Sequence, residues 1–142
     1  MKEFFQSVRD AGFAIPRIQR QRAHYEDLAR SIGANLSGMP SHRNPTSKVE
    51  TAAIELADLW EELGNRLLQY EALIKEAQRV IDRMHTQRYK TLLTERYINL
   101  RSWPDVTRIL GYRDEKSVFR AHGFALAEAA AGCLPPRVDV IL

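Results

Sequence analysis

Cysteine is nearly absent from this sequence, since Cys133 is the only one in 142 residues. A single cysteine excludes an intramolecular disulfide and fits a reducing compartment. Together with four scattered histidines it offers no zinc or iron–sulfur spacing, so we expect no metal site. The chain also lacks the roughly eighteen successive apolar residues of a membrane span, and its N-terminus lacks the apolar core of a signal peptide. We therefore expect a cytoplasmic protein without a membrane partner.

The residue patterns typical of enzymes are missing as well. No glycine-rich phosphate loop is present, and no Cys/His or Ser/His arrangement stands out. Glu61 and Glu62 are adjacent in a helical pattern, so they point in different directions, which suits solvation better than acid–base catalysis. We expect no enzymatic activity, no catalytic residue and no cofactor.

Positive charge is concentrated at the two ends of the chain, although the net charge is only +3. Residues 1–48 carry a net +4, residues 49–85 a net −4, and residues 86–132 a net +3. Basic segments on both sides of an acidic one suit a protein that touches phosphate with its ends. Ordinary solvated helix faces give the same counts, so charge alone does not decide between these interpretations.

The middle of the chain carries the most regular apolar pattern. Apolar residues recur at alternating spacings of four and three, which predicts one long helix from about Ser47 to His85 with a stripe that faces a partner helix. The members of this seam are Val49, Ala53, Leu56, Trp60, Leu63, Leu67, Tyr70, Ile74, Ala77, Ile81 and Met84. Further apolar residues widen the stripe, which favours a bundle of three or four helices over a bare coiled coil. Gly64 inside the helix indicates a bend or a close helix crossing.

A second apolar stripe in the N-terminal part of the chain can pair with the long helix. Its members are Ile15, Ile18, Tyr25, Leu28, Ala29 and Ile32, and Arg22 interrupts it. The stretch 33–47 is rich in Gly, Ser, Asn and Pro and predicts a loop, which lets the two helices pack antiparallel within one chain or between subunits. Residues 1–14 are mildly apolar, and we expect them to form a short docking helix. We therefore predict an all-α fold with a helical hairpin over 1–85 and a homo-oligomer, preferably a dimer, formed through the long helix.

The stretch from Thr94 to Ala130 predicts two short helices joined by a glycine turn. Ser102 is a favoured N-cap for the first helix, and Pro104 fits its first turn because a missing N–H costs nothing there. Gly111 suits the left-handed residue that commonly ends a helix. Asp114 can then cap the second helix.

Three short helices can close a common core in this part of the chain. A supporting helix precedes the pair and is expected to end near Asn99. The expected core residues are Leu93, Tyr97, Trp103, Val106, Leu110, Val118 and Leu126, with Ile109 on the apolar face of the first helix and Ala121 and Ala125 on that of the second. We predict a three-helix helix-turn-helix unit over 86–132, followed by a tail at 133–142. The usual function of such a unit is to place its second helix in the DNA major groove.

Short motifs in this unit follow a recognisable order and spacing. They are Leu93-Thr-Glu-Arg96-Tyr97-Ile98, Ser102-Trp103-x-x-Val106, Leu110-Gly111-Tyr112 and Ser117-Val118-Phe119-Arg120-x-His122-Gly123-x-Ala125-Leu126. In these residues the chain resembles the RinA- and ArpU-type transcriptional regulators of phages, whose C-terminal part is similar to region 4 of bacterial sigma factors. The resemblance covers roughly the last third of the chain closely and the central helix more loosely. It implies a sigma-like helix-turn-helix, double-stranded DNA as ligand, and regulation of phage or prophage transcription in a bacterial host cell.

The chain departs from that family at the cap of the second helix, where such regulators usually place a serine and this chain has Asp114 followed by Glu115. Two carboxylates near the groove repel phosphate, which favours an alternative function, a protein-binding module that docks on RNA polymerase or a sigma factor. A further alternative is a DNA-recognition subunit of phage packaging, similar to small terminases. Those proteins more often place the DNA-binding unit before the oligomerisation helices, the reverse of the order here. A large ring of subunits would favour packaging, and a monomer or dimer would favour regulation.

Eight residues are candidates for DNA contact. They are Lys116, Ser117, Phe119, Arg120 and Gly123 on the second helix, Arg113 in the turn, and Arg101 and Arg108 beside the first helix. A cation on the reading helix can bind bases or phosphates, and Phe119 can meet a thymine methyl group or pack on an adjacent helix. Arg101 and Arg108 can grip the DNA backbone, where contacts position without specifying sequence. For His122 we prefer a hydrogen bond across the domain to a phosphate contact.

Overall fold

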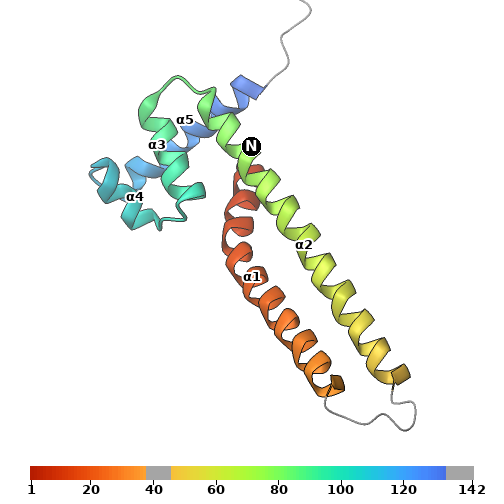
Figure 1. The fold of residues 1–142 in the computed structure, drawn as a ribbon. Coiled ribbons are helices and arrows are strands. Elements are labelled where there is room, and N and C mark those ends of the chain that lie inside the picture. Colours follow the sequence, from red (N-terminus) through yellow and green to blue (C-terminus); the bar gives the residue numbers. More distant parts are fainter. Residues whose placement is uncertain (38–45, 134–142) are drawn as a thin grey trace, which may run out of the picture. The chain divides into compact units, whose positions relative to one another are not determined.

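The computed structural model describes residues 1–37 and 46–133, and its regular elements are all helical. The predicted all-α fold is confirmed, and no strand occurs in the described part of the chain. The elements are α1 (Lys2–Ser37), α2 (Thr46–Asp82), α3 (Gln87–Leu93), a π-helical turn η1 (Thr94–Ile98), α4 (Trp103–Leu110) and α5 (Glu115–Cys133) (Figure 1). Cys133, assigned to the tail by the sequence, is the last residue of α5. The rest of the predicted tail, 134–142, and the middle of the predicted loop, 38–45, lie outside the described residues.

α1 is one continuous helix that runs through Pro16. The expected division into a short docking helix and a separate second helix is therefore wrong. An interior proline removes one backbone hydrogen bond and costs about 3 kcal/mol. Apolar residues buried on both sides of it offset that cost, among them Val8, Ala11, Ala14 and Ile18. Residues 33–37 are also helical, so the predicted loop begins too early.

α2 matches the predicted long helix closely, although it begins at Thr46 and ends at Asp82. Residues 46 and 47, assigned to the loop by the sequence, are thus already helical. Five later members of the heptad seam are buried, namely Leu63, Leu67, Ala77, Ile81 and Met84. The earlier members, up to Trp60, are half-buried or exposed. The first half of the seam is therefore incompletely covered.

The chain divides into two compact units. The first joins Met1–Phe13 to the described residues from Glu71 onward, and the second is Ala14–Tyr70. The unit that contains the helix-turn-helix extends beyond the expected range 86–132, because the start of α1 and the end of α2 bury side chains in it. Its buried residues are Phe5, Val8, Ala77, Val80, Ile81, Met84, Leu92, Leu93, Tyr97, Val106, Val118, Ala121, Ala125 and Ala129. Three expected core residues are only half-buried and pack against this cluster: Trp103, Leu110 and Leu126.

The first turns of α1 are anchored to the segment between α3 and α4. The Phe5 ring is fully buried, and its centroid lies 5.1 Å from that of Tyr97. The Arg9 guanidinium donates hydrogen bonds to the backbone carbonyls of Arg96 and Arg101. The docking expected of residues 1–14 is therefore confirmed for 1–13, although they belong to a longer helix.

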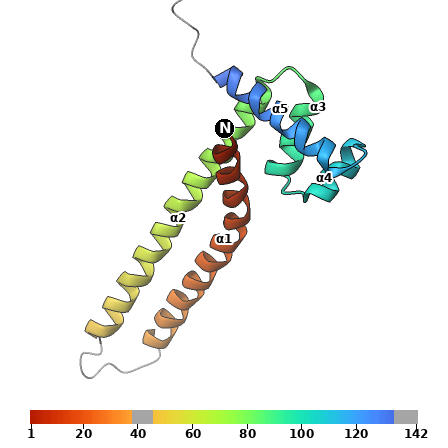
Figure 2. The same ribbon diagram turned by 180° about the vertical axis from the view of Figure 1, so that it is seen from behind.

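In the second unit α1 and α2 form an antiparallel hairpin within one chain (Figures 1 and 2). Its buried residues are Ala14, Ile18, Leu63 and Leu67. The Arg22 guanidinium lies 3.8 Å from the centroid of the Trp60 ring, and its Nε donates to the Trp60 carbonyl at 3.2 Å. A Cβ at Gly64 would lie 2.8 Å from Arg22 Nη2, so Gly64 marks the close crossing indicated by the sequence. Arg22 interrupts the apolar stripe because it spans this crossing.

Candidate nucleic-acid interface

α4 is bounded by the residues that the sequence indicates. The Ser102 hydroxyl accepts a hydrogen bond from the Asp105 amide at 3.3 Å, and Pro104 occupies the first turn. Gly111 ends the helix with a φ of 71°, in the left-handed region that costs a larger residue about 1–2 kcal/mol. Ile109 is exposed, so its assignment to the apolar inner face is wrong. Only a narrow stripe of this short helix, centred on Val106, is buried.

The turn between α4 and α5 is held by a side chain of α3. Arg88 Nη2 donates to the Leu110 carbonyl at 3.3 Å, and its guanidinium lies 4.1 Å from the centroid of the Tyr112 ring. The hydrogen bond spans 22 residues of sequence, so no local signal around Arg88 indicates it. This contact fixes the point from which α5 departs.

α5 begins at Glu115, directly after the expected Asp114 cap. One Asp114 carboxylate oxygen accepts both the Ser117 amide, at 2.9 Å, and the Ser117 hydroxyl, at 2.8 Å. These two hydrogen bonds lower the pKa of Asp114 below its ordinary value. The Asp114 charge thus faces the positive end of the helix dipole. Ser117 is half-buried with its hydroxyl engaged in the cap, which leaves it a weaker candidate for base contact.

α5 has a buried inner side and an exposed outer side. The inner side consists of Val118, Ala121, Ala125 and Ala129. Four candidate contact residues share the outer side: Lys116, Phe119, Arg120 and Gly123. Phe124 accompanies them with 57% of its surface exposed, and it is not among the contact residues predicted from the sequence. Its spacing of four residues from Arg120 is the signal that places both on neighbouring positions of one face.

Phe119 and Gly123 give this outer side its shape. The Phe119 ring meets the Trp103 ring edge-on, with centroids 5.2 Å apart, and is nevertheless exposed. It therefore packs on α4 and still presents an aromatic surface to solvent. A Cβ at Gly123 would meet nothing within 4 Å, so the missing side chain leaves the backbone of α5 accessible.

The five candidate cations differ in what they contact. Three are exposed and form no ion pair with any described residue: Arg113, Lys116 and Arg120. Arg108 pairs with Asp105 at 2.8 Å, and Arg101 Nε lies 3.3 Å from a carboxylate oxygen of Glu95. The unpaired cations therefore lie on the turn and the first turns of α5. The two residues assigned to the DNA backbone already have a carboxylate partner.

His122 is half-buried between Tyr97 and Trp103. Its Nε2 lies 2.6 Å from the Tyr97 hydroxyl, a hydrogen bond across the unit, and the Trp103 ring packs edge-on at 4.8 Å. Burial, with smaller contributions from the charges of Arg96 and Lys2, lowers the pKa of His122 to about 4. The imidazole is therefore neutral near pH 7, and the preferred hydrogen bond across the domain is confirmed.

We expect acid to destabilise this unit partly through His122. A histidine in the unfolded chain titrates near pH 6.5, whereas the folded pKa is about 4. Since the unfolded state binds the proton more readily, stability should fall as the pH drops from about 6.5 toward 4. His122→Gln should flatten this part of the pH profile in thermal melts. Superimposable profiles of the parent and the variant over that range would contradict the assignment.

No helix in the described ranges is long and apolar enough to cross a membrane. The same residues contain no cluster of three or more His, Cys, Asp or Glu that could hold a metal ion. Comparison of the chain with protein families, curated proteins and solved structures finds no match.

Proposed function

We propose that the protein binds double-stranded DNA through α5 and regulates transcription in a phage or prophage. The observation that carries this proposal is a helix-turn-helix pair whose second helix exposes Lys116 and Arg120 as unpaired cations. The second helix of such a pair fits the major groove, where cations meet phosphates and base edges. The resemblance to RinA- and ArpU-type regulators supports the regulatory role.

In this proposal Arg120 contacts base edges, while Lys116 and Arg113 contact phosphates. A guanidinium can donate two parallel hydrogen bonds to one guanine, which gives a sequence preference. Phe119 offers an aromatic surface for a thymine methyl group, and Gly123 lets the α5 backbone approach the groove closely. The phosphate contacts supply affinity that depends on salt and not on sequence.

The two carboxylates at the start of α5 do not oppose this arrangement equally. Asp114 accepts two hydrogen bonds from Ser117, and the helix dipole balances part of its charge. Glu115 is exposed, so its charge would repel a nearby phosphate. The proposal therefore places the phosphates beside Arg113 and Lys116 and away from Glu115.

Arg108→Ala should weaken binding to every DNA sequence by a similar factor. Arg108 is exposed, and its surface pair with Asp105 is weak enough to open for a phosphate. Loss of one phosphate contact should reduce the slope of log affinity against log salt by about 1. Titration of two unrelated duplexes over a range of salt measures both effects. Arg83→Ala, an exposed arginine in the turn after α2, is the charge control. A loss confined to one duplex would contradict a backbone role for Arg108.

Enrichment from a pool of random duplexes tests the proposed function. The parent protein and a Lys116→Ala, Arg120→Ala variant are each put through successive rounds of selection against competitor DNA. Both substituted residues are exposed, so the variant should stay folded, which circular dichroism checks. We expect the parent to enrich one sequence motif and the variant to enrich none. A folded parent that enriches nothing, or a variant that enriches the same motif, would reject DNA reading by α5.

A protein-binding function has a supporting observation of its own. Ile109, Phe119 and Phe124 are all exposed, and exposed side chains of this size mark protein contacts when they gather on one surface. RNA polymerase or a sigma factor is the partner of this alternative. Phe124→Ala separates the two functions, because it removes apolar surface without removing a cation. It should weaken binding to a protein partner and leave Arg120-dependent DNA binding unchanged.

A further inference from the structure

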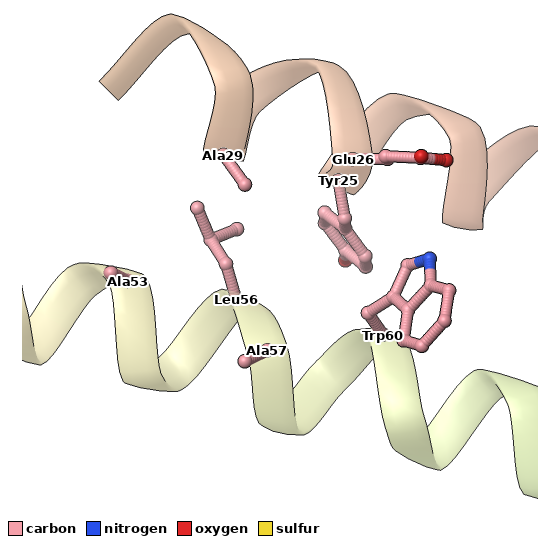
Figure 3. Close-up of a pocket in the computed structure, with 7 residues that line it drawn as sticks. All are labelled: Tyr25, Glu26, Ala29, Ala53, Leu56, Ala57 and Trp60. Atoms are coloured by element: carbon pink, nitrogen blue, oxygen red, sulfur yellow. The ribbon is translucent and has the colours of Figure 1, made fainter. Parts of the chain in front are cut away.

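An apolar groove between α1 and α2 remains open in the hairpin of the second unit (Figure 3). It has a volume of about 220 Å³ and is lined by Tyr25, Ala29, Ala53, Leu56, Ala57 and Trp60. Tyr25 and Leu56 point into the gap between the two helices, whereas the alanines contribute only methyl groups (Figure 3). The charged residue at the groove, Glu26, pairs with Arg30 of the same helix at 2.9 Å.

Exposed apolar residues of α2 extend this groove along the hairpin. One row of α2 has spacings of three and four and includes Ala57 of the groove: Ile54, Ala57, Glu61, Gly64 and Leu68. Ile54 is 62% exposed and Leu68 is 65% exposed. We call the groove and this row the groove face. A second groove, of about 160 Å³, includes the polar residues Gln21, Glu62 and Arg66, so the groove face is the more apolar surface.

The two helices of the hairpin carry opposite charge. From residue 14 to 37, α1 has four arginines and two carboxylates, a net +2. From residue 46 to 70, α2 has two basic residues and five carboxylates, a net −3. Each ion pair among the described residues of this unit joins two residues of the same helix, and none joins α1 to α2. Each helix therefore retains charge that a partner of opposite sign can balance.

We propose that the groove face is a dimerisation surface, covered by the same face of a second copy of this chain. A two-fold axis parallel to the helices places the basic α1 of each copy against the acidic α2 of the other, in a bundle of four antiparallel helices. A two-fold axis across the helices would instead set α1 against α1 and α2 against α2. Charge complementarity therefore identifies the second copy as the occupant and selects its orientation.

The Arg22–Trp60 contact sets the levels at which charges meet in this dimer. An axis parallel to the helices moves no residue along the bundle, so α1 keeps the same level against α2 of the second copy. Because α1 and α2 run in opposite directions, residues before Arg22 on α1 lie level with residues after Trp60 on α2 of the second copy. Residues after Arg22 likewise lie level with residues before Trp60. The expected ion pairs are Arg20 with Glu61 of the second copy, and Arg30 with Glu50 of the second copy. All four side chains are exposed in the single chain.

Sedimentation equilibrium on the full chain tests this proposal. The parent protein should have twice the chain mass of 16.3 kDa. The variant Arg20→Glu, Arg30→Glu makes α1 acidic, and the variant Glu50→Lys, Glu61→Lys makes α2 basic. Each variant alone should raise the dimer dissociation constant at least about tenfold, because every contact becomes repulsive. Mixed in equal amounts, the two variants should form a heterodimer, in which every contact again joins opposite charges.

The variant Arg17→Glu, Glu55→Lys is the matched control, since it reverses charges outside the groove face. It should leave the dissociation constant unchanged within about twofold, and circular dichroism should show that every variant keeps its helices. A monomeric parent at high concentration, a parent assembled into larger rings, or charge variants that stay apart when mixed would each overturn the proposal. The test uses no DNA, so its outcome is independent of the function proposed for α5.

Discussion

Replacing Phe5 with alanine is expected to lower the free energy of unfolding of the helix-turn-helix unit by about 3–5 kcal/mol. Phe5 is fully buried, with its ring centroid 5.1 Å from that of Tyr97. Its removal leaves a cavity in a core to which residues from Ala77 to Ala129 also contribute. Because the chain has two compact units, a probe confined to one unit is needed. Urea unfolding followed by Trp103 fluorescence in a Trp60→Phe background provides it.

Phe13→Ala is the matched control for this loss of stability. Phe13 belongs to the same helix and the same unit, but it is 55% exposed. Its ring contacts the Arg9 guanidinium at 5.0 Å, so its removal should cost at most about 1 kcal/mol. Equal losses from the two substitutions would show that the start of α1 does not complete the core of the helix-turn-helix unit.

Arg120→Ala should weaken binding to the preferred duplex by about 1–3 kcal/mol, a factor of roughly 5 to 150. Binding to unrelated DNA should change much less, because Arg120 is proposed to contact bases and the phosphate contacts of Arg113 and Lys116 remain. The ratio of the two affinities, measured by mobility-shift titration, is therefore the quantity to compare. Arg120 is exposed and forms no ion pair with a described residue, so the substitution should leave the stability of the unit nearly unchanged.

Arg120→Lys and Arg83→Ala are the two controls for that experiment. Lysine retains the charge but cannot donate two parallel hydrogen bonds, so Arg120→Lys should lose sequence preference and keep the salt dependence. Arg83→Ala removes one exposed positive charge outside α5 and should keep the preference. Equal binding of Arg120→Ala and the parent to the preferred duplex would refute the groove assignment.

The boundaries of α4 and the start of α5 could be predicted because their causes are local. Ser102, Gly111 and Asp114 act on backbone groups within a few residues, through a hydroxyl, a left-handed φ and a carboxylate. Helical periodicity likewise predicted Val118, Ala121 and Ala125 on the inner side of α5, and most of its outer side. These patterns need no knowledge of what the helices pack against.

The contacts that join distant segments could not be predicted in this way. Phe5 meets Tyr97, and Arg88 binds the Leu110 carbonyl, although neither pair is close in sequence. Such contacts depend on how the helices pack. The ion pairs of Arg101 with Glu95 and of Arg108 with Asp105 were not foreseen either, although both are local and the second has the helical spacing of three residues.

Two irregular features of the helices also had no clear signal in the sequence. Pro16 ordinarily predicts a helix end, but packing on both sides keeps α1 continuous. The supporting helix ends at Ile98 with Asn99 as its C-cap, near the expected position, yet its last turn is π-helical, with the Asn99 amide bonded to the Thr94 carbonyl at 2.9 Å. In both places tertiary packing outweighs the local preference of the chain.

Sequence-specific DNA binding is tested most directly by a mobility-shift titration with duplex fragments from the neighbourhood of the protein's own gene, at about 50 mM and 200 mM salt. One fragment should be bound at least about a hundredfold more tightly than random DNA at the higher salt. Arg120→Ala should abolish this preference. Equal, salt-sensitive binding of every fragment, or no binding at either salt, would contradict a sequence-specific DNA-binding function.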